Sequence, residues 1–434
     1  MNTRLLTLTV AILATAALQS FARNHEEIFT DSLKESHRII FIGDGSRPAT
    51  DSIRAAIDMF YMDQFRHFQD PRAPYFLFLS KDNKLAMGIG GVVRMRGWYD
   101  WGGIIGYNGF IPYAIPVPKN DADRRKLDST PAGTAFFFRV IGRNHKLGDY
   151  QLYIEANFNG YQSRDFHLKK AYATVNDWTV GYASSSFSDP TAAPPTVDAQ
   201  GPQAYVQTTA VLLRWMHTFR KHWTTAASVE MPDSRVDADN ISTGKSNDWF
   251  PNIAAFGQYG WNTDNHLRIS GIMRILPYRD IIARQNRNVT GWGIQLSSSF
   301  RPTGQLRLFA TASGGRGYGS LTGDLLMGNF DLIGKPDDKG RMYAPASFTW
   351  LGAAQYHFRP DLFASATLGQ ERLLPRHGID SSTYKYGLYS ALNVFWYPVP
   401  RLELAGELNL GKRKNFNGES RWARRISLMV QFSF

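Results

Sequence analysis

The chain has 434 residues, of which 43% are hydrophobic and 14% aromatic, with 38 glycines and no cysteine. No run of about 18 apolar residues follows the N-terminal region, which excludes a bundle of transmembrane helices, and the lack of cysteine excludes disulfides and thiolate metal sites. The formal net charge is +12, but the basic residues are scattered singly and form no Lys/Arg-rich run, so a nucleic-acid partner is not expected.

A secretory leader is predicted at the N-terminus, over residues 1–22. It combines Arg4 with an apolar run from Leu5 to Leu18 and ends in Ser20-Phe21-Ala22, which fits a small-x-small cleavage site. This pattern is typical of a signal peptide and not of a spanning helix. Export argues against a cytoplasmic enzyme.

Residues 23–83 are predicted to form an N-terminal periplasmic segment with a helix at about 52–68. Thr50 or Asp51 is the expected helix cap, and the Asp70-Pro71 pair ends the helix. The apolar stripe of this helix consists of Ile53, Ile57 and Phe60. The stripe favours a helix tucked under a barrel or against a neighbouring subunit over an independent module, and no heptad repeat predicts a coiled coil.

Residues 84–434 alternate in polarity with the period of a β-strand. The alternation is clearest in the last segment, where the apolar face comprises Trp422, Ile426, Leu428, Val430, Phe432 and Phe434. A soluble sheet would need helices to cover such a face, and this part of the sequence predicts none. A transmembrane β-barrel turns the apolar face to lipid and the polar face to a wet lumen.

Sixteen such segments are predicted, and their connections alternate between short turns and longer loops, as an even-stranded barrel with both termini on the short-turn side requires. The predicted strands are 84–100, 132–144, 147–159, 164–175, 177–188, 203–219, 222–231, 249–261, 265–276, 286–301, 304–317, 341–358, 360–371, 382–397, 401–411 and 421–434. No internal repeat of about 40 to 50 residues supports a propeller. The expected fold is an all-β, antiparallel barrel of about sixteen strands in the bacterial outer membrane, wide enough for an aqueous channel.

Side chains on the polar face of these strands are candidates for lining the lumen, and cations outnumber acids among them. The predicted pore-lining residues are Arg94, Arg96, Arg139, Arg143, Glu155, His167, Lys169, Arg268, Arg274 and Arg307, with Lys385, Arg401, Arg425, Glu371, Glu403 and Glu407 also facing inward. Cationic side chains along an aqueous path favour anions over cations. The alternative for each residue alone is a structural charge paired across a solvated interior.

The segment 189–202 is predicted to be a rigid loop that folds inward and narrows the channel. Its four prolines exclude both a helix and a central strand. In this arrangement, Asp189 and Asp198 are expected to oppose Arg94, Arg139 and Lys169 across the constriction.

No catalytic or cofactor motif is found. The histidines are scattered, no Gly-x-Ser-x-Gly pattern occurs, and the glycine-rich stretch 314–317 lies at the end of a strand and not before a helix. Asp233, Asp237 and Asp239 lack a calcium-loop pattern, so a solvated acidic loop is favoured over a metal site. A barrel hydrolase is therefore disfavoured.

Several short motifs between residues 84 and 205 resemble those of the DcaP-like trimeric outer-membrane porins of Gram-negative bacteria. The motifs are Gly91-Val92-Val93-Arg94 with Tyr99-Asp100, Tyr153-Ile154-Glu155 with Phe158, Leu168-Lys169-Lys170-Ala171-Tyr172, Phe187-Ser188-Asp189, Pro194-Pro195-Thr196-Val197-Asp198 and Gly201-Pro202. Two features depart from the family: Tyr182-Ala183-Ser184-Ser185 replaces a Gln-x-Trp-Ser strand end, and the N-terminal coiled coil is not evident.

The resemblance implies a homotrimer of sixteen-stranded barrels that passes small, preferably anionic solutes such as dicarboxylates. Phe434 at the end of the last strand resembles the C-terminal signature that the barrel-assembly machinery recognises, and the remaining expected partners are outer-membrane lipid and lipopolysaccharide. The alternative function is a scaffold or surface-binding barrel whose lumen is plugged by the segment 23–80.

Overall fold

The structure is a computed structural model that describes residues 38–42, 76–80, 85–119, 124–144, 146, 148–159, 165–198, 200–220, 222–261 and 265–434. The predicted signal peptide and the predicted helix at 52–68 lie outside these residues. Within the described residues, no helix is long and apolar enough to cross a membrane.

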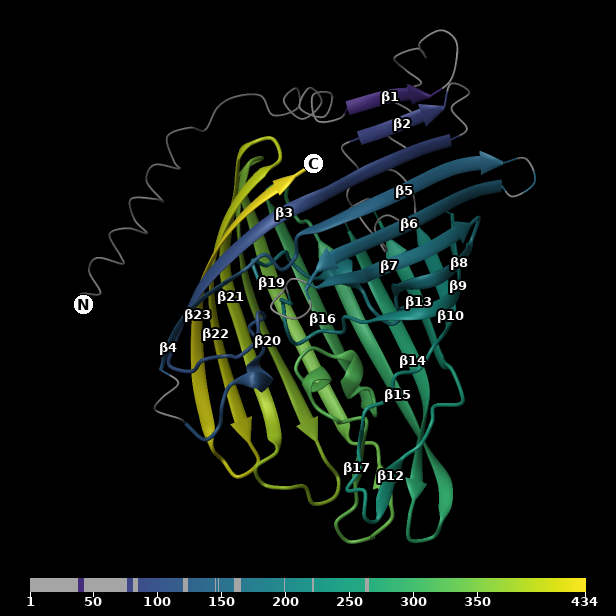
Figure 1. Cartoon of the computed structure of the whole chain (residues 1–434), viewed down its shortest axis with the longest axis vertical. Helices are drawn as coiled ribbons and strands as arrows, with labels where there is room; N and C mark the ends of the chain where they lie inside the picture. Colours follow the sequence, from purple (N-terminus) through teal and green to yellow (C-terminus); the bar gives the residue numbers. More distant parts are fainter. Residues whose placement is uncertain are drawn as a thin grey trace.

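The fold is a closed antiparallel barrel of sixteen strands, as predicted from the sequence (Figure 1). The wall strands are β3 (Leu85–Trp101), β5 (Ala135–Asn144), β6 (Gly148–Phe158), β7 (Phe166–Val175), β8 (Trp178–Ser184), β9 (Thr209–Phe219), β10 (Trp223–Glu230), β13 (Asn252–Gly260), β14 (His266–Asp280), β15 (Gln285–Phe300), β16 (Leu306–Arg316), β19 (Ala346–Arg359), β20 (Leu362–Leu374), β21 (Tyr384–Val399), β22 (Leu402–Asn415) and β23 (Ser420–Ser433). The last strand pairs with the first, from Arg424 opposite Trp101 to Ser433 opposite Val92, and this pairing closes the ring.

The remaining strands and the short 3-10 turns are not among the sixteen wall strands. They are β1 (Arg38–Ile42), β2 (Phe76–Ser80), β4 (Arg125–Thr130), β11 (Val236–Asp237), β12 (Thr243–Lys245), β17 (Leu332–Gly334), β18 (Met342–Tyr343), η1 (Pro112–Ala114), η3 (Pro190–Ala192), η4 (Gly319–Leu321) and η5 (Leu325–Met327). Strands β11, β17 and β18 form a small separate sheet.

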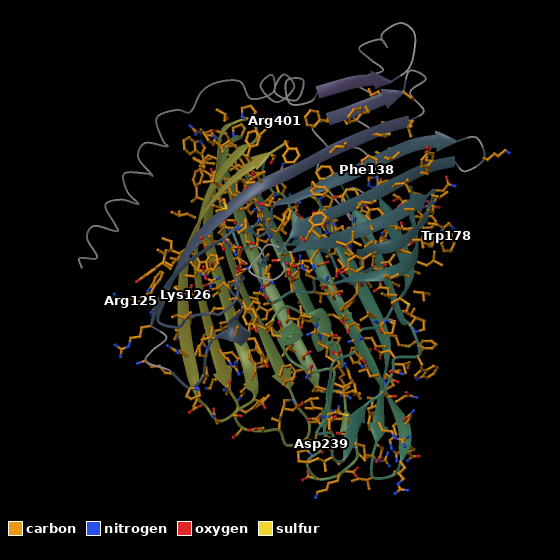
Figure 2. All side chains as sticks on the ribbon, in the orientation of Figure 1. Arg125, Lys126, Phe138, Trp178, Asp239 and Arg401 are labelled. Carbon is orange, nitrogen blue, oxygen red and sulfur yellow. The ribbon has the colours of Figure 1, made fainter. Side chains whose placement is uncertain are left out.

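The burial pattern of the wall follows the alternation of the sequence. On β23, Leu428 is 67% exposed and Val430 is 51% exposed, whereas the flanking Ser427 and Gln431 are each 1% exposed. Near the short turns, exposed aromatic side chains form a girdle that includes Trp178 (Figure 2), Trp223, Tyr259 and Trp261. An apolar outer band with an aromatic girdle is the surface that a bilayer requires.

Two strands of the segment 23–83 were not predicted from the sequence. Strand β2 pairs antiparallel with β3 from Phe76 opposite Ile89 to Leu79 opposite Ala86, and β1 pairs with β2 in parallel. Since β23 pairs with β3 only from Val92 onwards, the first residues of β3 would present an open edge. Strand β2 covers that edge, which protects it from pairing with other chains.

Two predicted strands are shorter in the structure, because the chain between them leaves the wall. Strand β8 ends at Ser184 and β9 begins at Thr209, so residues 185–208 form one loop, called loop 3 here. Loop 1 (102–134) and loop 6 (317–345) are two further long connections on the same side of the barrel. These three loops carry most of the contacts described below.

Candidate functional site in the barrel lumen

One end of loop 3 is anchored to the inner face of β14 and β15 through Asp189. The Asp189 carboxylate, which is fully buried, lies 2.8 Å from Nε2 of His266 and accepts a hydrogen bond of 2.6 Å from the Ser297 hydroxyl. Arg268 lies 3.5 Å from the same carboxylate and donates to the Ser188 carbonyl at 3.1 Å. Burial alone would raise the pKa of Asp189, but Arg268, His266 and Ser297 together hold this pKa well below its usual range.

The middle of loop 3 is anchored on a different part of the wall, at β3 and β22. Asp198 pairs with Arg96 at 3.0 Å and accepts a hydrogen bond of 2.7 Å from the backbone amide of Phe110 in loop 1. Glu407 on β22 accepts hydrogen bonds from the backbone amides of Val197 and Asp198, at 2.9 and 3.2 Å. Loop 3 therefore runs between β14–β15 and β22–β3, which are well separated around the ring.

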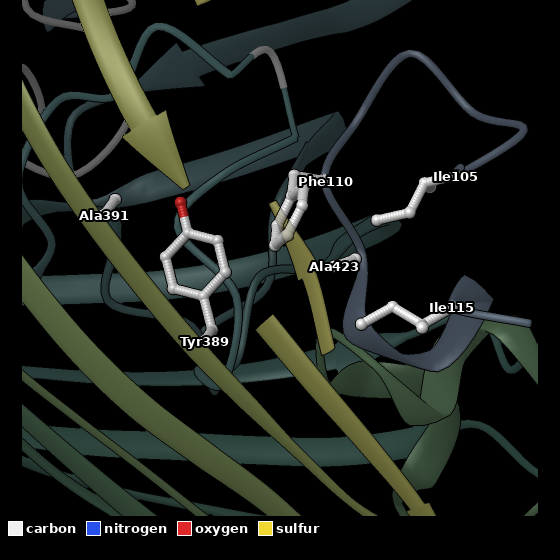
Figure 3. Close-up of a cluster of buried hydrophobic side chains, with 6 residues drawn as sticks. All are labelled: Ile105, Phe110, Ile115, Tyr389, Ala391 and Ala423. Atoms are coloured by element: carbon white, nitrogen blue, oxygen red, sulfur yellow. The ribbon is translucent and has the colours of Figure 1, made fainter. Parts of the chain in front are cut away.

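Loop 1 packs against the inner wall through apolar side chains. Ile105, Phe110 and Ile115 of loop 1 meet Tyr389 and Ala423 of the wall (Figure 3).

A buried ion pair next to this contact fixes the start of loop 1. Arg425 pairs with Asp100 through Nε at 2.6 Å and donates to the Asn108 carbonyl at 2.9 Å. The indole of Trp98 lies 4.9 Å from the Arg425 guanidinium and 5.2 Å from that of Arg96, so one aromatic ring contacts both cations.

Loop 6 is held in the lumen by buried carboxylates. Glu371 on β20 accepts hydrogen bonds from the backbone amides of Asp324 and Leu325, at 2.6 and 3.3 Å, and from the Thr322 hydroxyl. Tyr384 donates to Asp324 at 2.6 Å. Burial raises the pKa of Asp324 to about 7, against the opposing effects of the Tyr384 hydrogen bond and of Arg413.

A cavity of about 380 Å³ lies between loop 3 and the first wall strand. Arg94 contributes to its wall side, and loop 3 contributes four prolines, Asp198 and Tyr205. The carboxylates of loop 3 are bound by wall residues and backbone amides, as described above. The cavity therefore has a cationic side chain on one side and a largely apolar proline surface on the other.

The predicted pore-lining residues fall into two groups. The first group is buried: Arg96, Arg139, Arg268 and Arg274 are between 1% and 3% exposed. Arg96 and Arg268 bind loop 3, and Arg274 binds loop 6 by an ion pair of 3.1 Å with Asp331. Arg139 donates to Gln151 of the neighbouring strand at 2.9 Å. These arginines hold loops and wall in place.

The second group is more accessible. It comprises Arg94 at the cavity, Lys169 at 2.5 Å from the mostly buried Glu155, Arg307 bound to Ser299 at 2.8 Å, and the exposed His167. The side chain of Arg143 lies outside the described part of the structure.

The expected opposition of Asp189 and Asp198 to Arg139 and Lys169 is wrong. Asp189 instead pairs with His266 and Arg268, and Asp198 pairs with Arg96. The reason is that loop 3 turns its carboxylates towards the wall, where buried cations compensate their charge, while Arg139 and Lys169 find partners on β6. Arg94 lines the cavity beside loop 3, as expected.

Sequence reasoning missed several residues that fix the loops. They are Trp98, Asp100, Asp324, Asp331 and Tyr384. Asp100 was within reach of the sequence, because it lies directly opposite Arg425 once the last strand is paired with the first. The two loop 6 carboxylates carried no such signal, since nothing in the local sequence says which loops fold inward.

The outer-loop aspartates do not gather into a metal site in the part of the chain that the structure describes. Asp239 (Figure 2) accepts hydrogen bonds from the backbone amides of Ile241, Ser242 and Thr243, at 3.0, 2.8 and 2.7 Å. Its carboxylate therefore caps its own loop.

Comparison with known proteins supports the fold. No known protein-family model matches the sequence, and neither does any curated protein. Among solved structures, the outer-membrane channel DcaP of Acinetobacter baumannii has a TM-score of 0.70 at 20% identity, covering 82% of this chain and 99% of that one. The anion-selective porin from Comamonas acidovorans has a TM-score of 0.55 at 11% identity, covering 81% and 100%.

Outer-membrane-expressed OmpT of Vibrio cholerae has a TM-score of 0.52 at 8% identity, covering 82% of this chain and 99% of OmpT. The resemblance to DcaP-like porins that the motifs indicated is thus confirmed at the level of the fold, which is that of outer-membrane channel barrels.

Proposed function

We propose that the protein is an outer-membrane porin for passive diffusion of small hydrophilic solutes, with a preference for anions. The observation that carries the proposal is loop 3, which is bound at two points inside a sixteen-stranded barrel and has Arg94 opposite its proline surface. A rigid inward loop in a wide barrel limits the size of the solutes that pass, and the accessible cations lower the electrostatic cost for anions.

The inner wall suits hydrophilic solutes because its side chains are mostly polar. On β15, for example, the inward residues Gln295, Ser297 and Ser299 are buried, while the alternate Ile294 and Leu296 are exposed on the outside. A preference for anions is also a property of the Comamonas porin with which the chain shares its fold. Dicarboxylate-like solutes are the proposed class, on the strength of the motif resemblance.

The proposal includes a homotrimer, insertion through the barrel-assembly machinery by way of the Phe434 strand, and lipopolysaccharide as a neighbour in the membrane. The fold similarity includes a trimeric form of OmpT, at a TM-score of 0.50 and 9% identity. Crosslinking of the purified protein tests the trimer, and a ladder that stops at the monomer contradicts it. We do not propose a catalytic activity.

Liposome swelling tests the proposed porin function. Proteoliposomes are exposed to solutes of matched size, such as succinate and a neutral four-carbon polyol, and the rates of swelling are compared. The proposal predicts swelling with both and a faster rate for the anion at low ionic strength, where charge effects are least screened.

The competing function, a scaffold barrel plugged by residues 23–80, predicts no swelling until that segment is deleted. Equal rates for the anion and the polyol would contradict the anion preference, and no swelling by either protein would contradict the porin.

A further inference from the structure

A second cavity, of about 700 Å³, lies at the long-loop end of the barrel and is not part of the lumen site. It is an open pocket lined by the end of the β14–β15 hairpin and by residues 335–342 of loop 6. Its polar lining comprises Asn286, Arg287, Asn288, Lys335, Asp338 and Arg341. We propose that this cavity is a binding site for a phosphate-bearing polyanion.

The cavity is a built feature of the loops. Residues 335–341 form a closed turn, in which the amide of Lys335 donates to the Arg341 carbonyl at 2.9 Å and the amide of Arg341 donates to the Asp338 carbonyl at 3.1 Å. The turn presses on the hairpin at Gly340, where φ is +84° and an added Cβ would lie 2.6 Å from Oδ1 of Asp280.

An apolar cluster beneath the cavity holds the two walls together. Leu276 and Tyr278 of β14 pack there against Leu332 and Met342 of loop 6. The two walls of the cavity are therefore fixed before any ligand arrives, which lowers the entropic cost of binding.

The charge of the two walls is positive. Residues 279–287 carry three arginines and one aspartate, and residues 335–341 carry three cations and two aspartates. The two segments together therefore carry six positive and three negative charges. The lining itself contains three cations (Arg287, Lys335 and Arg341) and one carboxylate (Asp338). Arg287 uses Nε to bind Asp280 at 2.8 Å, which leaves its two Nη atoms as donors for an oxyanion.

Two amides add neutral donors to the cavity. Oδ1 of Asn286 accepts a hydrogen bond of 3.1 Å from Arg279, and Oδ1 of Asn288 accepts one of 3.1 Å from the Trp249 indole. Because arginine and tryptophan only donate, these bonds fix the orientation of both amides. Their NH2 groups remain available, so most of the lining donates hydrogen bonds and suits a ligand rich in acceptors.

Two exposed tryptophans lie near the cavity. Trp292 on β15 is 44% exposed, and Trp249, which donates to Asn288, is 64% exposed; exposed tryptophans mark the membrane interface, where lipid phosphate groups lie. Asn286 and Arg287 lie further along β15 towards the loops. A phosphate bearing several charges can reach the cavity either as a free solute or as part of lipopolysaccharide, and guanidinium and ammonium groups recognise both sources in the same way.

Calorimetric titration of lipopolysaccharide-free, refolded full-length protein tests the site. The probes are sodium tripolyphosphate and purified lipopolysaccharide, at low ionic strength. We expect saturable binding of tripolyphosphate that the double substitution Lys335→Gln/Arg341→Gln weakens by at least about tenfold, because it removes two cationic donors of charge-assisted hydrogen bonds. Lipopolysaccharide binding that falls with the same substitutions assigns a lipid-bound phosphate, and binding of tripolyphosphate alone assigns a free one.

The matched control is Arg284→Gln/Lys339→Gln. It removes the same amount of charge, one cation from the hairpin and one from residues 335–341, but neither residue lines the cavity, so we expect less than a threefold change. Equal weakening by both pairs, equal binding of citrate, or no saturable binding of either probe would overturn the site. The measurement involves no conduction, so its outcome is independent of the porin proposal.

Discussion

Replacing Asp189 with alanine is expected to release one end of loop 3. The substitution removes the ion pair with Arg268 and the hydrogen bonds with His266 and Ser297, and it leaves Arg268, which is 3% exposed, without its carboxylate partner. Removing one partner of a buried ion pair costs about 3 to 5 kcal/mol. Even 3 kcal/mol corresponds to a shift of more than about 100-fold between the bound and released states of the loop.

Single-channel recording in planar bilayers measures the consequence. We expect Asp189→Ala to increase the conductance and the open-channel noise, and Asp189→Asn to show a smaller effect because the amide keeps an acceptor for Ser297. Asp337→Ala, which removes an exposed carboxylate from loop 6, serves as the control and is expected to leave conductance unchanged. Unchanged conductance in a folded Asp189→Ala protein would refute the role assigned to loop 3.

Three further predictions concern the other loop contacts and the pore charge. Because the pKa of Asp324 is raised to about 7, its docked form is the neutral one; docking of loop 6 is strongest at low pH and weakens as pH rises from about 4 to about 7. Conductance should therefore increase over this range, and Asp324→Asn should flatten the profile. Arg96→Ala should lower the free energy of unfolding by about 3 to 5 kcal/mol in a denaturation experiment, because it removes the cation that pairs with the buried Asp198. Arg94→Gln should reduce anion selectivity in reversal-potential measurements, whereas Arg139→Gln, at 1% exposure, should not.

The barrel was predictable because each wall strand must alternate between a lipid-facing and a lumen-facing side chain. A side-chain period of two with lipid on one face leaves a strong signal, and the lengths of the connections fixed the topology. The same alternation placed Arg96, Arg268 and Arg274 on the inner face, where the structure has them.

The partners of those arginines could not be predicted from the sequence. Whether an inward cation faces water or a buried carboxylate depends on which loop reaches it, as Asp331 reaches Arg274 and Asp198 reaches Arg96. Such contacts join residues far apart in the chain, and no local pattern encodes them. The prolines of loop 3 signalled a rigid loop, but not that its carboxylates turn to the wall.

The reversal potential of the reconstituted protein in a potassium chloride gradient tests the central proposal most directly. We expect a conducting channel, because loop 3 is bound inside the barrel and Arg94 supplies a cationic side chain. Its reversal potential should have the sign expected for chloride selectivity, and this selectivity should decline as the salt concentration rises. A reversal potential of the opposite sign, or no conductance from correctly folded protein, would contradict the proposal.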